Sequence, residues 1–435
     1  MARAKRRLSG LAGGALVLAA LGGCIGGPDG GPRSGRRAPP VLAETPSDDG
    51  LPPAGLGLPP AGLGLPPAGL GLPLAETGVP VPAAPGTRIG TGSVKVALVV
   101  PLTGPGAAVG AALRNAAELA IEDFQKPDLQ ILVKDDRGTT EGAREAAQAA
   151  VTEGAELVLG PLFAANVRAA AGVTRTAGKP IIAFSTDAAV AARGVYLLSF
   201  LPQAEVDRIV AEAVAKGRRS IAALIPENSY GNAVEAQFRE AVAHRGARLV
   251  GIERYVPGNP GPAVARLAGL ITGGGAQADA LFLPDTPDGL AGLDPVLTRA
   301  GFSPTRVRPF GTAVWNDPRV FALPALQGGW FAAPDAAGFA GFSQRYQARF
   351  GTVPPRVATL SYDAVSLMAA LSRQFGSQRF ADATLTNPSG FSGIDGTFRF
   401  RPDGPSDRTL AVYEIRSGAP AVISPAPRVL ARSGT

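Results

Sequence analysis

From residue 94 onward, apolar segments of strand length alternate with longer segments of helical periodicity. Val94–Val100 is an almost continuous apolar run, as expected of a strand buried on both faces of a parallel sheet. Residues 106–124 follow, with apolar side chains at helical spacing. This alternation is typical of doubly wound α/β sheets with helices on both faces. Because ten or more such units exceed one sheet, we expect two parallel-sheet lobes.

The other predicted elements continue this alternation. We expect strands at 129–134, 157–159, 181–184, 221–225, 248–255 and 280–283. We expect helices at 141–153, 164–177, 203–216, 232–245, 263–271, 337–350 and 357–375. Near the C-terminus, residues 397–400 and 409–413 flank a turn sequence at 402–405, which predicts a β-hairpin.

The segment before this region cannot build a packed core. Residues 25–92 contain 16 Gly and 15 Pro, and the heptapeptide LPPAGLG occurs at 51–57, 58–64 and 65–71. A period of seven could indicate a coiled coil, but two prolines and two glycines per repeat exclude a helix. We expect a disordered, polyproline-II-biased tether that reaches about 200 Å when extended and about 45 Å as a coil.

The N-terminus has the pattern of an export signal. Basic residues precede a thirteen-residue apolar run at 8–20, which is too short for a membrane-spanning helix. The run ends in Leu21-Gly22-Gly23-Cys24, which resembles a bacterial lipobox. The resemblance implies a signal peptide at 1–23, lipid on Cys24, and a lipid-anchored linker at 24–92. The alternative is a plain signal peptide with an incidental Cys.

The residue after Cys24 bears on where the lipid would anchor the chain. Ile25 in place of Asp resembles default sorting to the periplasmic side of the outer membrane. In a Gram-positive host, the same anchor would lie in the cell membrane.

Composition excludes several functions. The formal net charge is +7, but four basic residues lie at the extreme N-terminus and the remaining charges are scattered, so nucleic-acid binding is disfavoured. One Cys and one His, His244, exclude a Cys/His zinc site and leave no nucleophile–base pair. Gly104, Gly106 and Gly110 follow a strand with the spacing GxGxxxG, not the dinucleotide fingerprint GxGxxG. We therefore expect no cofactor and no catalysis.

Polar and turn residues follow the predicted strands. In open α/β sheets, ligands bind beyond the carboxyl ends of the strands. Hydroxyls and backbone N–H groups at helix N-termini suit a small anion, whereas an acid and a Tyr suit an ammonium group or an aromatic contact. Ser185 and Thr186 could instead only cap the next helix, and Trp315 could only pack an edge. The sequence predicts a ligand cleft at Thr103, Gly104, Pro161, Phe163, Ser185, Thr186, Tyr230, Asp285 and Trp315.

Several short motifs occur in the order of a known family. They are Pro101-Leu102-Thr103-Gly104, Lys134-Asp135-Asp136, Leu159-Gly160-Pro161, Tyr230-Gly231 and Ser361-Tyr362-Asp363-Ala364-Val365. Together they resemble the type I periplasmic-binding family, the leucine-binding-protein class, over roughly 93–425. The resemblance implies a domain at 93–427 whose two lobes close over a ligand. It places lobe 1 at about 93–202 and 334–385, and lobe 2 at about 203–333 and 386–427.

Within this class the third strand is followed by Phe163-Ala164-Ala165-Asn166, where amino-acid importers usually carry Ser or Thr. Three features are similar to lipoprotein activators of bifunctional penicillin-binding proteins. They are Gly160–Phe163 with Asn166-Val167, the 196–200 stretch with acids following at Glu205 and Asp207, and the terminal hairpin ending at Arg416. That resemblance implies a non-enzymatic outer-membrane lipoprotein that activates a penicillin-binding protein in peptidoglycan synthesis. The alternative is the substrate-binding lipoprotein of an ABC importer for amino acids or amides, with an ABC permease as partner.

Overall fold

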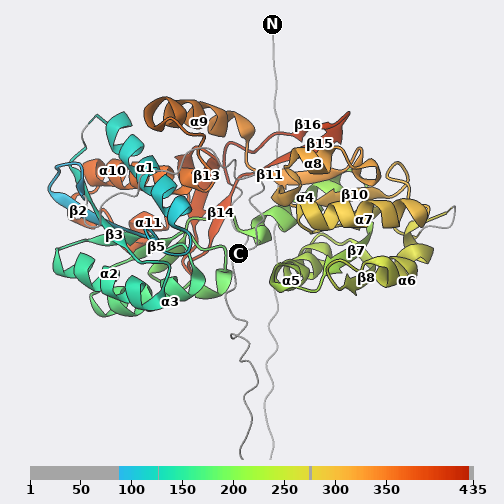
Figure 1. Cartoon of the computed structure of the whole chain (residues 1–435), viewed down its shortest axis with the longest axis horizontal. Helices are drawn as coiled ribbons and strands as arrows, with labels where there is room; N and C mark the ends of the chain where they lie inside the picture. Colours follow the sequence, from blue (N-terminus) through green and yellow to red (C-terminus); the bar gives the residue numbers. More distant parts are fainter. Residues whose placement is uncertain (1–87, 126, 274–276, 431–435) are drawn as a thin grey trace, which may run out of the picture. The chain divides into compact units, whose positions relative to one another are not determined.

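The structure, a computed structural model, describes residues 88–125, 127–273 and 277–430. These residues form two α/β lobes, each built on one large sheet with helices packed against it (Figure 1). The predicted signal peptide, Cys24 and the repeats at 51–71 lie outside the described residues. The predicted α/β class with two parallel-sheet lobes is confirmed, and each sheet also has antiparallel strands at one edge.

The first lobe contains the N-terminal strands of the described chain. They are β1 (Arg88–Ile89), β2 (Val94–Val100), β3 (Leu129–Asp135), β4 (Leu157–Leu159), β5 (Ile181–Ala183) and β6 (Val195–Leu197). Their order in the sheet is β1-β3-β2-β4-β5-β6. All pair in parallel except the edge strand β1, which is antiparallel to β3.

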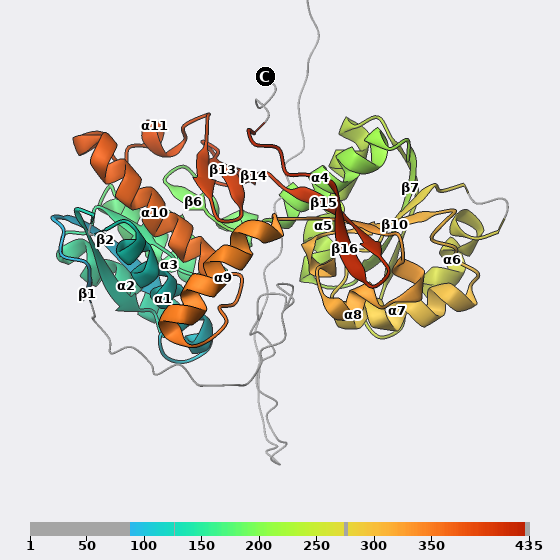
Figure 2. The ribbon, with the colours of Figure 1, turned by 90° about the horizontal axis from the view of Figure 1, so that it is seen from above.

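The helices of this lobe cover both faces of the sheet. They are α1 (Ala107–Asp123), α2 (Thr140–Thr152), α3 (Ala164–Thr176), α9 (Ala336–Phe350), α10 (Ala358–Gln374) and α11 (Asp382–Leu385), with short 3-10 turns η1 (Ala188–Val190) and η4 (Gly376–Gln378). Alternate residues of a strand point to opposite faces. Val96 and Leu98 accordingly pack with α1 and α10, whereas Ala97 and Val99 pack with α2 and α3. Figure 2 shows α9 and α10 beside α1, which both contact.

The second lobe has a seven-stranded sheet. Its strands are β7 (Ser220–Pro226), β8 (Arg248–Tyr255), β9 (Ala280–Phe282), β10 (Arg308–Gly311), β11 (Trp330–Ala333), β15 (Ala411–Arg416) and β16 (Ala419–Ser424). Their order is β16-β15-β11-β10-β9-β7-β8, and only β15 and β16 are antiparallel to their neighbours. The helical segments are α4 (Pro202–Ala215), α5 (Ser229–His244), α6 (Gly261–Ile271), α7 (Pro287–Arg299), η2 (Ala313–Trp315), α8 (Pro318–Phe321) and η3 (Pro324–Leu326).

Aromatic rings form the centre of the second core. Phe238 of α5 stacks on Phe282 of β9 with 4.6 Å between ring centroids, and Phe282 packs on Phe310 of β10 at 5.3 Å. All three side chains are fully buried. Burial of one such ring contributes about 1.5–3 kcal/mol to folding, so this column joins a helix to two neighbouring strands.

The predicted C-terminal hairpin is correct only in part. Strands β12 (Phe391–Gly393), β13 (Gly396–Phe400) and β14 (Ser406–Arg408) form a separate antiparallel sheet. The turn at 402–405 therefore joins β13 to β14, whereas residues 411–416 join the second large sheet. Phe398 and Phe400 of β13 belong to the core of the first lobe, so assigning all of 386–427 to the second lobe is corrected. The other lobe boundaries stay predictions.

The elements that were not predicted from the sequence include the long helix α7 and the strands β10 and β11. α7 has Pro287 at its first position and Pro295 inside it, so its sequence looks like a loop. β10 contains Pro309, and β11 has only four residues. These short strands form because they pair with β9 and β15. The pattern of a single sequence does not show which strands will pair.

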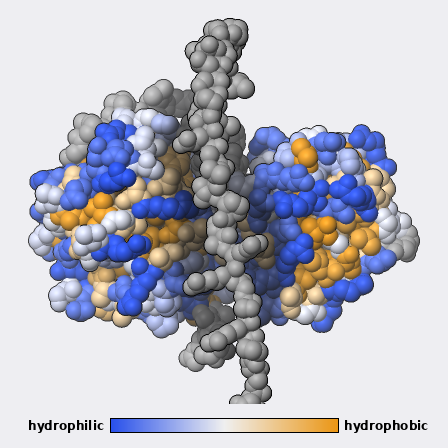
Figure 3. Space-filling view, turned by 90° about the horizontal axis from the view of Figure 1, so that it is seen from below, coloured by the Kyte–Doolittle hydropathy of each residue, from blue (hydrophilic) through white to orange (hydrophobic). Residues whose placement is uncertain are grey.

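The surface has the ordinary character of a water-exposed protein. On the face drawn in Figure 3, apolar patches are bordered by hydrophilic residues. Among the described residues, no helix combines the length and the apolar character needed to cross a bilayer.

Candidate functional site

The loop after β2 is held rigidly by the end of β3. Asp135 accepts hydrogen bonds from the backbone N–H groups of Leu102 (2.8 Å) and Thr103 (3.2 Å) and from the Thr103 hydroxyl (2.6 Å). Although partial burial acts to raise the pKa of Asp135, these bonds hold it below its usual range. Gly104 has φ 68°, a left-handed conformation that favours glycine. The predicted site residues Thr103 and Gly104 therefore lie in a preformed loop, but the Thr103 hydroxyl is already engaged.

Phe163 packs against the beginning of α1. It is the residue before α3 and forms no side-chain cap to that helix. Its ring lies so close to Gly106 that a Cβ added there would come within 2.9 Å of the ring. Gly106 has φ 85°. A side chain at Gly106 would therefore both clash and be strained, and the sequence places an apolar ring between the β2–α1 and β4–α3 loops.

The loop after β5 lies next to the loop after β4, which leads into α3. The backbone N–H of Phe184 donates to the Pro161 carbonyl at 3.0 Å, which ties the loops after β4 and β5 together. Ser185 is buried, and its hydroxyl oxygen accepts from the Asp187 N–H at 3.2 Å. A serine hydroxyl still has one proton to donate, and within the described residues neither Ser185 nor Thr186 donates a side-chain hydrogen bond. Ser185 and Thr186 lie in the loop after β5, which is bonded to the loop that precedes α3, and α3 begins without a side-chain cap.

A second buried pair fixes α3 in position. Asn166 donates to Asp136 at 3.0 Å, and both side chains are almost completely buried. Burial raises the pKa of Asp136, against the opposing effect of the Asn166 and Gly138 hydrogen bonds. Asp136 and Asn166 both occur in motifs noted from the sequence, but the sequence did not show that they pair. The pair positions the helix and engages one N–H of the Asn166 amide.

In the second lobe, polar side chains meet beyond β7 and β10. The Tyr230 hydroxyl and the Thr312 hydroxyl are 2.6 Å apart, and both residues are buried. Glu205, at the start of α4, accepts from the Ala313 N–H at 2.9 Å. Burial raises the pKa of Glu205 to about 7, because the charged form is poorly solvated there. Sequence reasoning missed Thr312, since the strand before it was not predicted.

Asp285 follows β9 at the same edge. It accepts from the Tyr255 hydroxyl and from the Thr286 backbone N–H, the latter at 2.7 Å. Burial raises its pKa. It also lies near enough to Tyr230 for its charge to act on that phenol. Tyr230 and Asp285 are therefore brought together, with Tyr255 as a partner that sequence reasoning missed.

Trp315 lies inside the second lobe. Its side chain is fully buried, and its indole N–H donates to the Leu283 carbonyl at 2.9 Å. Gly311 makes room for it, because a Cβ there would lie 2.1 Å from the indole nitrogen. Trp315 packs in the second core and is hydrogen-bonded to the residue that follows β9. Its membership of a ligand site stays a prediction.

The nine predicted residues thus form two sets. Thr103, Gly104, Pro161, Phe163, Ser185 and Thr186 follow three adjacent strands of the first sheet, whereas Tyr230, Asp285 and Trp315 follow the strands of the second. Each set lies at the carboxyl ends of its strands, as the sequence predicted. That the two sets face one shared ligand stays a prediction.

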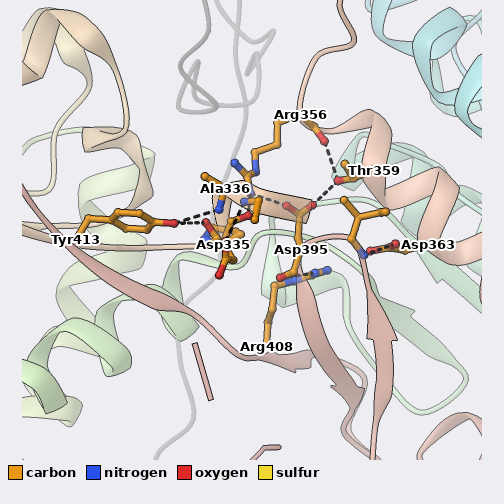
Figure 4. Close-up of polar contacts among 11 residues, drawn as sticks. Asp335, Ala336, Arg356, Thr359, Asp363, Asp395, Arg408 and Tyr413 are labelled. Carbon is orange, nitrogen blue, oxygen red and sulfur yellow. Dashed lines mark hydrogen bonds and ion pairs between the residues drawn. The ribbon is translucent and has the colours of Figure 1, made fainter. Parts of the chain in front are cut away.

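A buried charge cluster lies where the small sheet meets α10 (Figure 4). Asp395, which is fully buried, accepts from Arg356 and from the Thr359 hydroxyl, both at 2.5 Å. The Arg408 guanidinium donates to the Asp395 carbonyl at 3.4 Å. Asp363 accepts from the Ile394 N–H at 2.8 Å. Burial raises the pKa of Asp363 to about 7, against the effect of Arg408. Two arginines and two carboxylates therefore share one buried region.

This cluster touches the segments that connect the lobes. Arg356 also donates to the Asp335 carbonyl at 3.1 Å. Tyr413 of β15 donates to the Pro334 carbonyl at 3.3 Å and accepts from the Ala336 N–H at 3.1 Å (Figure 4). The connection from β11 to α9 is thereby bonded both to the first lobe's charge cluster and to a strand of the second sheet.

Comparison with known proteins identifies the family. A family model described as "Periplasmic binding protein" matches residues 93–420. The chain belongs to the periplasmic binding protein family. Its fold is the two-lobed type I fold of leucine-binding-like proteins, which is a ligand-binding, non-enzymatic fold. Membership implies an extracytoplasmic location. Among curated proteins, none matches the chain significantly.

Solved structures share the fold at low sequence identity. A candidate branched-chain amino acid ABC transporter from Rhodospirillum rubrum has a TM-score of 0.67 and 23% identity, covering 76% of this chain and 99% of that one. An ABC transporter substrate-binding protein from Sphaerobacter thermophilus has a TM-score of 0.60 and 17% identity, covering 76% and 96%. The branched-chain amino acid transporter substrate-binding protein of Streptococcus pneumoniae, in complex with isoleucine, has a TM-score of 0.54 and 18% identity, covering 77% and 99%.

Proposed function

We propose that this protein is a non-enzymatic receptor that binds a small carboxylic acid at the strand ends of the first lobe. One observation carries the proposal. The start of α3 has no side-chain cap, and the loop before it is bonded to the loop after β5, where the hydroxyls of Ser185 and Thr186 have no hydrogen-bond acceptor among the described residues. Backbone N–H groups at a helix N-terminus and short hydroxyls together make a favourable carboxylate site.

The apolar surroundings indicate what the carboxylate is attached to. Phe163 is half-buried over Gly106, so a ligand held at α3 would contact an aromatic ring. Structures of the same fold were solved with isoleucine and with benzoate, and both molecules join a carboxylate to an apolar body. The proposed ligand is an acid of this kind, and the proposed role is substrate delivery to an ABC importer.

A thermal-shift series on the mature chain tests this function. The panel contains leucine, isoleucine, benzoate and 3,4-dihydroxybenzoate. A ligand at 100 times its Kd stabilises the folded state by about 2.7 kcal/mol. We expect at least one acid to raise the Tm of the wild type and not that of S185A/T186V. The matched control is S303A/T305V, which removes the same groups from an exposed turn of the second lobe. A blank panel, or equal loss in both double variants, contradicts the proposal.

A second candidate is activation of a penicillin-binding protein. The observation that favours it is the degree to which the predicted ligand groups are already satisfied: Thr103 by Asp135, Tyr230 by Thr312, and Trp315 by Leu283. A rigid surface of this kind suits protein docking. The test is a glycan-polymerisation assay with a purified penicillin-binding protein and the mature chain. Unchanged synthase activity, together with no co-purification, would remove this candidate.

The lipid anchor and outer-membrane location belong to the same proposal. They rest on Cys24 and on Ile25 after it. A triacylated N-terminal Cys contributes about 0.8 kcal/mol of membrane affinity per buried CH₂. We expect Cys24→Ser to release the protein from the outer-membrane fraction, with cell fractionation and mass spectrometry of the N-terminal peptide as measurements. Detection of an unmodified Cys24 in the membrane fraction would contradict the anchor.

A further inference from the structure

A surface pocket lies on the first lobe at the amino ends of the strands, whereas Thr103 and Ser185 lie beyond the carboxyl ends. Its volume is about 430 Å³. It is lined by the end of α3, by the residues just before β5 and β6, and by the beginning of α11. Pro180 and Ala381, which are half-buried, supply apolar surface, and the buried side chains of Val195 and Phe380 lie behind it. The pocket is therefore separate from the strand ends where the family-type ligand is proposed.

Its charge is strongly positive. Arg175, Lys179 and Arg193 line it, together with a single acid, Asp382. Asp382 accepts from Arg193 at 2.8 Å and from the Tyr196 hydroxyl at 2.9 Å, and the Arg193 hydrogen bond is the main cause that holds its pKa low. Asp382 therefore neutralises only Arg193. Within the described part of the chain, the side chains of Arg175 and Lys179 form no hydrogen bond and no ion pair.

A structural role at the end of α3 does not account for these two cations. Basic residues in the last turn commonly bond the free carbonyls of a helix. Here the Gly178 N–H already donates to the Arg175 carbonyl at 3.1 Å, and the Lys179 N–H to the Thr174 carbonyl at 2.8 Å. The cationic groups of Arg175 and Lys179 are thus left available to the pocket.

We propose that this pocket is a second ligand site, which binds a small molecule carrying a phosphate or carboxylate group on an apolar body. The anionic group is held by Arg175, Lys179 and the remaining guanidinium donors of Arg193. The apolar part lies on Pro180 and Ala381. A phosphate and a carboxylate share this recognition chemistry, because both accept several charge-assisted hydrogen bonds. The site does not depend on the function proposed for the strand ends.

The test is calorimetry and ligand-observed NMR on the mature chain with phenyl phosphate, benzoate and neutral benzyl alcohol. We expect saturable binding of at least one anion and none of benzyl alcohol; the stronger anion identifies the group. Loss of two charged hydrogen-bond donors weakens binding about tenfold or more, so R175Q/K179Q should raise Kd by that factor. A381W, which fills the pocket without changing charge, should do the same. Circular dichroism melting confirms that both variants fold.

The control pair is R218Q/R219Q, which removes the same charge from the α4–β7 turn of the second lobe. We expect its Kd to stay within about twofold of the wild type, because separated exposed charges are largely screened. S185A/T186V should also bind normally, which separates this site from the proposed cleft ligand. Binding of neither anion, equal loss in R218Q/R219Q, or retained affinity in A381W would overturn the proposal.

Discussion

Asp395→Ala should be among the most destabilising single changes in the first lobe. Asp395 is fully buried and accepts from Arg356 and Thr359. Its removal leaves Arg356 and the buried Arg408 with Asp363 as the remaining carboxylate of the cluster. Removing one partner of a buried ion pair costs about 3–5 kcal/mol, because the other charge stays buried without compensation. The free energy of unfolding should fall by that amount.

The matched control is Asp403→Ala. Asp403 pairs with Arg401 in the turn between β13 and β14, where the two side chains are 58% and 49% exposed. An exposed pair of this kind contributes about 0–1 kcal/mol. The two substitutions remove the same group from neighbouring segments, so the difference between them reports burial and the number of partners.

The assay is urea unfolding at pH 7.5, followed by far-UV circular dichroism and by tryptophan fluorescence. Both tryptophans of the chain, Trp315 and Trp330, lie in the second lobe, so fluorescence reports that lobe and circular dichroism reports both. We expect the circular-dichroism transition of D395A to shift more than the fluorescence transition. Equal stability of D395A and D403A would refute the reasoning that the buried cluster stabilises the fold.

Three further predictions concern the pKa of a carboxyl group, a close helix approach and the proposed site. Burial raises the pKa of Glu205 from 4.5 to about 7. The folded state therefore binds a proton more tightly than the unfolded state and loses stability as the pH rises through that range. Glu205→Gln should become more stable relative to the wild type between pH 5 and pH 8, measured as ΔTm. A Cβ at Gly110 would lie 1.7 Å from the Pro101 carbonyl oxygen, whereas one at Gly172 meets nothing within 4 Å. Gly110→Ala should therefore unfold the first lobe. Gly172→Ala should raise the free energy of unfolding by about 0.4–1 kcal/mol, measured by urea titration. Phe163→Ser adds a hydroxyl at the uncapped start of α3 and should shift ligand preference in the thermal-shift panel from aromatic to aliphatic acids; an unchanged ranking would contradict the assigned role of the ring.

The regular part of the fold could be predicted because most of its strands are buried on both faces, although the edge strand β8 is only half-buried. Val94–Val100 and Arg248–Tyr255 have the bounds that the apolar pattern predicts, and the helices after them differ by at most a few residues at their ends. In these segments hydrophobic periodicity and tertiary packing agree. α7 and β10 were not predicted because their prolines interrupt the local sequence pattern. In the folded chain, neighbouring strands and the second core stabilise them.

The candidate site was predictable in position but not in hydrogen bonding. The rule that ligands bind at the carboxyl ends of parallel strands locates Thr103, Ser185 and Tyr230 without coordinates. It cannot show that Thr103 is engaged by Asp135, or that Tyr230 is engaged by Thr312. Those partners are distant in sequence, and only the folded sheet brings them together.

Side chains that already have hydrogen-bond partners within the fold therefore differ from those that are free to bind a ligand. A hydroxyl that is already bonded to a carboxylate must exchange that bond for one to a ligand, so the net gain is small. Ser185 and Thr186 need no such exchange, since their donors have no acceptor among the described residues, and the N–H groups at the start of α3 have no side-chain cap. Recognition on the first lobe should consequently depend on these groups and on the ring of Phe163. Thr103 and Asp135 then serve to keep the neighbouring loop from moving into the space that the ligand takes.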